Sequence, residues 1–224
     1  MKARIIEVFD TVQGEGIYFG EKQIFVRFFG CNLSCRFCDT PSNRFTEYEP
    51  QELFNEINLY KNDFHSISFT GGEPLLQKDF LKEILKLSSA GGYRNYLETN
   101  GTLAGELKEV IDYLDIIAMD LKLPSSIGMA SHLWGMHRKF LEVASKKEVF
   151  IKVVICHSTK EKDLREALKL IKEVNHSAIL VLQPNSHEDD AWLRVRIGVF
   201  ADMAQEENIT ACVIPQMHKA IGLE

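Results

Sequence analysis

From Pro50 onward, strand-like and helix-like segments alternate along the chain, and this alternation sets the fold class. Short apolar runs are separated by segments with apolar residues at helical spacing. Such a pattern favours parallel strands joined by right-handed helical crossovers. A closed barrel of eight units takes about 250 residues. The chain has 224, so we predict an incomplete, trimmed parallel β/α barrel of about six strands.

No linker or low-complexity segment divides residues 1–224, and we predict a single domain. Ser158 and Glu161 have the spacing of a capping box, which predicts the start of a helix there. The strands are expected at residues 5–9, 23–29, 66–70, 96–100, 115–120, 149–155, 178–182 and 209–214.

Charge and cysteine content narrow the class of protein. The formal net charge is −6 and no run of lysine or arginine occurs, which argues against a nucleic-acid partner and favours a small substrate. No apolar run is long enough for a membrane span. The cysteine count is odd and three cysteines cluster, which indicates a reducing compartment, so we predict a cytoplasmic protein. Cys156 and Cys212 lie in apolar segments and are expected to be core thiols.

Cys31, Cys35 and Cys38 have the spacing Cys-x3-Cys-x2-Cys, directly after the apolar segment 23–29. Three thiolates this close together require a cation between them. Zinc sites usually recruit a fourth protein ligand, and none follows in metal-binding spacing. Three cysteines can hold a 4Fe-4S cluster with one iron left open, which is the interpretation we favour. A zinc-binding interaction module is the alternative.

Two features before the cysteines point to a ligand. Arg27 interrupts an apolar strand, where a charge needs a carboxylate partner from the protein or from a ligand. Gly14 and Gly16 flank Glu15 in a tight loop whose backbone can approach a ligand, although a plain turn explains the spacing equally well. Ligands of open α/β sheets and barrels gather at the carboxyl ends of the strands. The cysteine loop follows such an end.

The cysteine motif, with the aromatic Phe37 before its last cysteine, resembles the radical S-adenosylmethionine superfamily. Gly71-Gly72-Glu73-Pro74 is similar to the superfamily's second motif, and Glu98-Thr99-Asn100-Gly101 to its next strand-end contact. The resemblance implies that the open iron binds S-adenosylmethionine, which is cleaved to a 5'-deoxyadenosyl radical. The residues implied in binding this cofactor are Phe37, Cys38, Asp39, Gly71, Gly72, Glu73, Glu98, Thr99, Asn100, Asp120, Leu121, Lys122, Gln183, Pro184, Asn185 and Ser186.

Two positions depart from the pattern of the superfamily. Many members have tryptophan where this chain has Phe37, which keeps the aromatic ring without an indole N–H. Some members carry Ser-Pro-Lys at the fourth strand end, where this chain has Asp120-Leu121-Lys122.

Within the superfamily, Gln13-Gly14-Glu15-Gly16, Phe25-Val26-Arg27 and Cys38-Asp39-Thr40 resemble the 7-carboxy-7-deazaguanine synthase family. The resemblance implies ring contraction of 6-carboxy-5,6,7,8-tetrahydropterin to 7-carboxy-7-deazaguanine with release of ammonia, in queuosine and deazapurine biosynthesis. Thr40 is implied as a ligand of Mg²⁺; without the resemblance it is a hydroxyl that caps a turn. The residues expected to bind the substrate are Val12, Gln13, Gly14, Glu15, Arg27, Thr70 and His218.

The family resemblance also implies a homodimer and an electron donor such as flavodoxin or ferredoxin. An activase of a glycyl-radical enzyme is the alternative enzyme, since such activases share the cysteine motif and a trimmed barrel but do not need Arg27 or Thr40. His218 follows the last strand and is equally consistent with a solvent-exposed side chain. The other histidines show no paired metal spacing and are expected to be structural or on the surface.

Overall fold

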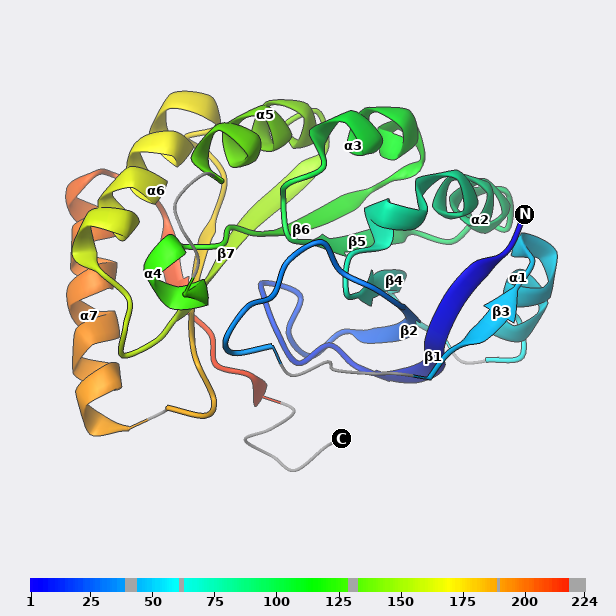
Figure 1. Ribbon diagram of the computed structural model, residues 1–224, viewed down its shortest axis with the longest axis horizontal. Coiled ribbons are helices and arrows are strands. Elements are labelled where there is room, and N and C mark those ends of the chain that lie inside the picture. Colours follow the sequence, from blue (N-terminus) through cyan, green and yellow to red (C-terminus); the bar gives the residue numbers. More distant parts are fainter. Residues whose placement is uncertain (39–43, 61–62, 129–132, 189, 218–224) are drawn as a thin grey trace.

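The computed structural model describes residues 1–38, 44–60, 63–128, 133–188 and 190–217. In these residues the strands form a single sheet, and helices cover one of its faces (Figure 1). The strands are β1 (Ala3–Val12), β2 (Lys22–Phe28), β3 (Thr46–Tyr48), β4 (Ser66–Gly71), β5 (Asn95–Thr99), β6 (Ile116–Asp120), β7 (Glu148–Ile155), β8 (Leu180–Pro184) and β9 (Ala211–Val213). The α-helices are α1 (Pro50–Ile57), α2 (Lys78–Ala90), α3 (Ala104–Val110), α4 (Pro124–Ile127), α5 (Trp134–Ala144), α6 (Glu161–Val174) and α7 (Ala191–Glu206).

The sheet is open, and its strand order is β3-β1-β2-β4-β5-β6-β7-β8-β9. Every neighbouring pair from β2 to β9 is parallel. Two edge elements, β3 and β9, are not joined to each other, so the predicted incomplete parallel barrel is confirmed. The antiparallel pairs of β1 with β2 and β3 were not part of the expected pattern. A connection as short as residues 13–21 joins antiparallel strands, whereas a parallel pair needs a longer crossover.

The helices pack on the convex face of the sheet, where Figure 1 shows α2, α3 and α5 following one another along the sheet and α6 and α7 at its β8 end. Each long helix contributes a buried apolar stripe, with Leu53, Leu81, Leu107, Phe140 and Leu168 all inaccessible to solvent. Because side chains alternate between the two faces of a strand, the inner face is left for a different set of residues. That inner face carries the polar side chains of the candidate site.

A smaller apolar cluster closes one end of the inner face. It contains Tyr96, Phe150 and Val181 from neighbouring strands, and Ile17 and Tyr18 pack against it from the loop of residues 13–21. Gly16 in this loop has φ +68°, and a Cβ there would lie 2.6 Å from the Phe150 ring. The loop therefore passes directly over the inner face of β7.

Some local predictions were wrong. Helix α6 begins at Glu161, and its N-cap is Lys160, so the capping box predicted from Ser158 does not form. The Thr159 hydroxyl instead accepts a hydrogen bond from the Cys156 N–H at 2.8 Å. Cys156 is buried as expected, whereas Cys212 is half-buried. Among the residues described, no helix combines the length and apolar character needed to cross a bilayer.

Candidate active site

A cavity of about 780 Å³ lies over the inner face of the sheet and reaches the carboxyl ends of its parallel strands. It brings together most of the residues selected from the sequence: Val12, Gln13, Gly14, Glu15, Arg27, Cys31, Cys35, Phe37, Cys38, Thr70, Gly71, Gly72, Glu98, Thr99, Asn100, Asp120, Lys122, Gln183 and Asn185. Four other selected residues are not part of its lining: Glu73, Leu121, Pro184 and Ser186. Asp39, Thr40 and His218 lie outside the described residues.

Gly71 and Gly72 allow the end of β4 to pass against the start of the cysteine loop. Gly71 has φ +132°, and a Cβ there would lie 2.3 Å from the Phe28 carbonyl oxygen. At Gly72 a Cβ would lie 2.1 Å from the Gly30 carbonyl oxygen and 3.1 Å from Cys31 Cβ. Any side chain at these positions would push the two segments apart, so the close approach requires both glycines.

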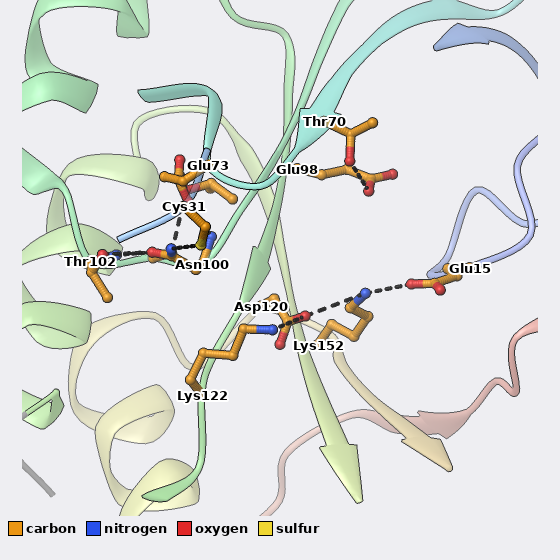
Figure 2. A network of polar contacts seen from close by, with 12 residues as sticks. Glu15, Cys31, Thr70, Glu73, Glu98, Asn100, Thr102, Asp120, Lys122 and Lys152 are labelled. Atoms are coloured by element: carbon orange, nitrogen blue, oxygen red, sulfur yellow. Dashed lines mark hydrogen bonds and ion pairs between the residues drawn. The ribbon is translucent and has the colours of Figure 1, made fainter. Parts of the chain in front are cut away.

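Cys31 is also anchored to the turn after β5. Asn100 Nδ2 donates a hydrogen bond to Asn32 Oδ1 at 2.8 Å and to Cys31 Sγ at 3.8 Å. Asn32 Nδ2 in turn donates to the Thr102 hydroxyl at 2.9 Å. Figure 2 shows Asn100 between Cys31 and Thr102. The first cysteine therefore has its position set by β4 on one side and β5 on the other.

The other two cysteines complete the cysteine-lined side of the cavity. Burial raises the pKa of the Cys35 thiol, and the nearby Lys122 charge acts in the opposite direction. The Lys122 ammonium also lies 5.2 Å from the centre of the Phe37 ring. In the described part of the chain, no group of three or more His, Cys, Asp or Glu residues is arranged around a single metal ion. A 4Fe-4S cluster places each thiolate on its own iron, so its cysteines do not converge on one point.

Glu73 supports the site from below its surface. Its side chain is fully buried, and its carboxylate accepts hydrogen bonds from the Leu75 N–H, the Asn100 N–H and the Thr99 hydroxyl at 2.8 to 3.1 Å. Burial raises the pKa of Glu73 to about 7, against the lowering effect of these donors. The Glu73 carboxylate thus joins the ends of β4 and β5, and only its backbone remains for a cofactor contact.

Glu98 connects the substrate-side residues. Gln13 Nε2 donates to Glu98 Oε1 at 2.9 Å, and the Thr70 hydroxyl donates to Glu98 Oε2 at 2.8 Å. Gln13 Nε2 also donates to Gln23 Oε1 at 2.9 Å. The loop after β1 and the inner face of β4 therefore converge on one carboxylate of β5, as Figure 2 shows for Thr70 and Glu98.

Arg27 has a carboxylate partner within the protein. Its Nε lies 2.6 Å from Glu7 Oε1, across the antiparallel pair of β1 and β2. The Arg27 side chain is 24% exposed and Glu7 is 49% exposed. The guanidinium carbon lies 5.7 Å from the centre of the Phe9 ring. The pair lines the open side of the cavity, so Arg27 is accessible to a ligand carboxylate while Glu7 holds its Nε.

A row of alternating charges crosses the cavity from Glu15 through Lys152 and Asp120 to Lys122 (Figure 2). Asp120 Oδ2 lies 2.8 Å from Lys122 Nζ and 3.5 Å from Lys152 Nζ. Lys152 also pairs with Glu15. Lys152 was not among the residues selected from the sequence. A lysine within the apolar run of β7 was a signal of the same kind as Arg27 in β2.

Two buried acceptors of the cavity have no hydrogen-bond partner among the described residues. They are Asp120 Oδ1 and Gln183 Oε1, and Gln183 is only 2% exposed. Buried polar atoms are nearly always paired, so two unpaired acceptors in a cavity indicate the donors of a ligand. The hydroxyl and amine groups of S-adenosylmethionine fit this requirement.

Comparisons with known proteins agree with this geometry. Residues 25–193 match the Radical SAM superfamily. The chain is 36% identical to a 7-carboxy-7-deazaguanine synthase of Geobacter sulfurreducens, with 98% of this chain and 97% of that protein covered. It is also 36% identical to one of Methanothermobacter thermautotrophicus, with 100% and 98% covered. The chain belongs to the 7-carboxy-7-deazaguanine synthase family of the radical SAM superfamily.

Solved structures support the fold of this family member. QueE from Escherichia coli superposes with a TM-score of 0.65 at 19% identity, over 95% of this chain and 93% of that one. A domain of a pyruvate-formate lyase-activating enzyme from Bacteroides vulgatus gives a TM-score of 0.54 over 66% of this chain, at 18% identity. The barrel is thus common to both classes of enzyme considered from the sequence. It is the full-length relatives that distinguish them.

Membership of the radical SAM superfamily implies a 4Fe-4S cluster and S-adenosylmethionine as cofactors. The cysteine side of the cavity fits the cluster, because all three cysteines line it and the glycines at the end of β4 let that strand end approach Cys31 closely. The two unpaired acceptors, Asp120 Oδ1 and Gln183 Oε1, fit a ligand rich in donors.

Proposed function

We propose that the protein is a 7-carboxy-7-deazaguanine synthase. It contracts the ring of 6-carboxy-5,6,7,8-tetrahydropterin to 7-carboxy-7-deazaguanine and releases ammonia, a step of queuosine and deazapurine biosynthesis. The observation that carries this proposal is the full-length likeness to synthases of this name, together with one cavity that holds both the cysteine motif and the substrate-side residues Gln13, Arg27 and Thr70.

The cofactor side of the cavity lies at the ends of β2, β4, β6 and β8. Cys31, Cys35 and Cys38 would hold the cluster, which with S-adenosylmethionine would supply radical chemistry beside the substrate. The backbone at Gly71 and Gly72 and the acceptors of Asp120 and Gln183 position the methionine and adenosyl parts of the cofactor. Asn185 and the Phe37 ring line the same side.

The substrate side lies at the loop after β1 and on β2, β4 and β5. Gln13 and Thr70 present amide and hydroxyl groups that match the donors and acceptors of a pterin ring, and both bond Glu98, which the family resemblance implies as a cofactor contact. The backbone of Val12 and Gly14 lines the same region. Arg27 binds the substrate carboxylate through its terminal nitrogens, while Glu7 holds its Nε.

Mg²⁺ and the partners belong to the same proposal. The Thr40 hydroxyl is a hard oxygen ligand of the kind that Mg²⁺ prefers, and the ion would stabilise charge on the substrate carboxylate. His218 would reach the substrate from the segment after β9. We also propose a cytoplasmic single-domain chain that acts as a homodimer and receives its electron from a flavodoxin or ferredoxin.

Anaerobic reconstitution tests this function. Protein supplied with iron, sulfide, reductant, S-adenosylmethionine, Mg²⁺ and the carboxypterin should form 7-carboxy-7-deazaguanine, which chromatography with mass spectrometry detects. Omission of Mg²⁺ should lower the rate. A Cys35→Ala variant, which lacks one cluster ligand, is the matched inactive control. Protein with an intact cluster that cleaves S-adenosylmethionine but yields no deazaguanine would reject the proposal.

A further inference from the structure

Lys152 lies between two carboxylates that belong to different parts of the site. On one side is Asp120, its direct partner in the parallel pairing of β6 and β7. On the other side is Glu15, in the loop of residues 13–21 that connects β1 to β2. Figure 2 shows the Lys152 ammonium reaching from the cofactor side of the cavity to this loop. A single side chain therefore spans the two halves of the cavity.

The loop of residues 13–21 carries the substrate-side contacts and crosses the open side of the sheet. Gln13, at its start, bonds Glu98. Its Gly14 carbonyl oxygen accepts a hydrogen bond from the Met217 N–H at 3.0 Å, and Gln216 Nε2 donates to Glu15 Oε1 at 2.6 Å. At the opposite end of the loop, the Tyr18 hydroxyl bonds Glu148 on β7. The position of the loop decides where Gln13 and Glu15 meet a ligand.

The two carboxylates beside Lys152 differ in how many cations they contact. Asp120 keeps a second cation, Lys122, at 2.8 Å. Among the described residues, the ion pair of Glu15 is with Lys152, and its other oxygen takes a hydrogen bond from the neutral Gln216. Burial acts to raise the pKa of Glu15, but the Lys152 charge together with the hydrogen bonds from Lys152 and Gln216 holds that pKa below its usual range. Loss of the Lys152 charge would leave Glu15 as a half-buried carboxylate without a cation, whereas Asp120 would remain paired with Lys122.

We propose that Lys152 is a positioning residue: it acts through Glu15 to hold the loop of residues 13–21, and thereby the substrate-side contacts, in the geometry that binds the substrate. The expected effect on the KM for the carboxypterin rests on the proposed function. The expected effect on the order of the loop does not, because hydrogen–deuterium exchange of the loop amides can be measured without turnover.

The experiment compares Lys152→Met, which keeps the length of the side chain, with Lys152→Arg, which keeps the charge. Lys172→Met is the matched control, because Lys172 pairs with Glu207 at 2.7 Å on the outer helices. Hydrogen–deuterium exchange with mass spectrometry follows the backbone amides of the loop in the cluster-loaded enzyme. We expect about tenfold faster exchange for Lys152→Met, and wild-type exchange for Lys152→Arg and Lys172→Met.

Steady-state kinetics supply the second readout. For Lys152→Met we expect the KM for the carboxypterin to rise about tenfold or more, while the KM for S-adenosylmethionine changes by less than about threefold, because Asp120 retains Lys122. Lys152→Arg should restore the carboxypterin KM to within about threefold of wild type. An unchanged carboxypterin KM, or an equal rise of both KM values, would overturn the positioning role.

Glu15→Gln covers the case in which Lys152→Met does not fold. This variant keeps the size of the side chain and removes its charge, and it should likewise speed the exchange of the loop and raise the carboxypterin KM. Wild-type exchange in the loop of Glu15→Gln or Lys152→Met would contradict the proposal whatever the activity. Absence of turnover by the wild-type enzyme would instead reject the proposed function, and the exchange data would still decide the role of Lys152.

Discussion

The carboxylate of Glu73, just after β4, accepts hydrogen bonds from the hydroxyl of Thr99, at the end of β5, at 2.9 and 3.0 Å. The same carboxylate accepts the Asn100 N–H, and Asn100 in turn contacts Cys31 and Asn32. A residue that does not line the cavity therefore sets the positions of residues that do. The cysteine loop depends on how these neighbouring strand ends are joined.

Glu73 should make the protein less stable as the pH rises. Burial raises its pKa to about 7 in the folded protein from 4.5, so ionisation is disfavoured by folding. The stability that depends on its protonated form is present below pH 4.5 and is lost as the pH rises through about 7. This loss is of the order of 3 kcal/mol at most. Urea denaturation of the cluster-free protein at pH 5.5 and 8 should show a steeper fall for wild type than for Glu73→Gln. The exposed Asp79→Asn variant should keep the wild-type slope.

His137 should have the opposite effect at lower pH. Its ring is buried, its Nδ1–H donates to the Gly101 carbonyl at 2.9 Å, and its Nε2 accepts the Lys122 N–H at 3.2 Å. Burial lowers its pKa to about 4, so the unfolded chain binds this proton first. Stability should therefore fall as the pH drops from about 6.5 towards 4, by about 2 kcal/mol at pH 5. A His137→Gln variant with the same loss between pH 7 and pH 5 would contradict this assignment.

Gly72→Ala should prevent cluster assembly. The added Cβ would lie 2.1 Å from the Gly30 carbonyl oxygen, so the cysteine loop must move away from β4. We expect iron and sulfide content after anaerobic reconstitution to fall to a small fraction of that of wild type. Gly105→Ala, in α3, is the matched control, because its Cβ would have no atom within 4 Å. Wild-type iron content in Gly72→Ala would show that the loop tolerates the displacement.

Arg27→Ala should weaken carboxypterin binding selectively. A hydrogen bond to a charged group contributes about 1.5 to 3 kcal/mol, so the KM for the carboxypterin should rise about 10- to 100-fold. Glu7→Gln should leave this KM close to that of wild type, since Glu7 contacts the Arg27 Nε and leaves the terminal nitrogens to the substrate carboxylate. If both variants raised the KM for the carboxypterin equally, substrate binding would depend on the Arg27–Glu7 ion pair. An Arg27→Ala enzyme with wild-type KM would show that another group binds the substrate carboxylate.

The barrel could be predicted from local signals, whereas most of the cavity residues were implied by the resemblance of short motifs to a known family. Apolar runs at strand spacing identified the parallel strands, and the polar residues just after them could be assigned to the carboxyl ends. Arg27 was recognised because a charge interrupts an apolar strand. The sequence left open whether its partner was a carboxylate of the protein or of a ligand, and the structure pairs it with Glu7.

What the sequence did not predict depends on contacts between distant segments. Lys152 pairs with Glu15, which is 137 positions away in the sequence, and no local sequence pattern predicts that ion pair. The Gly71-Gly72-Glu73-Pro74 motif does not reveal whether the Glu73 side chain faces a cofactor or the turn after β5. The capping box at Ser158 failed because Thr159 is held by Cys156 and Ser126, so the helix starts later.

The contact of Gln216 with Glu15 joins residues 201 positions apart, and it has a consequence for biosynthesis. The segment that contains the three cysteines, together with its supports on β4 and β5, is synthesised before Gln216. The loop of residues 13–21 gains its contact with Gln216 only after Gln216 has been synthesised, and this contact completes the last side of the substrate cavity. The cysteine loop and its supports are therefore present in the nascent chain before the contact that completes the substrate side of the cavity.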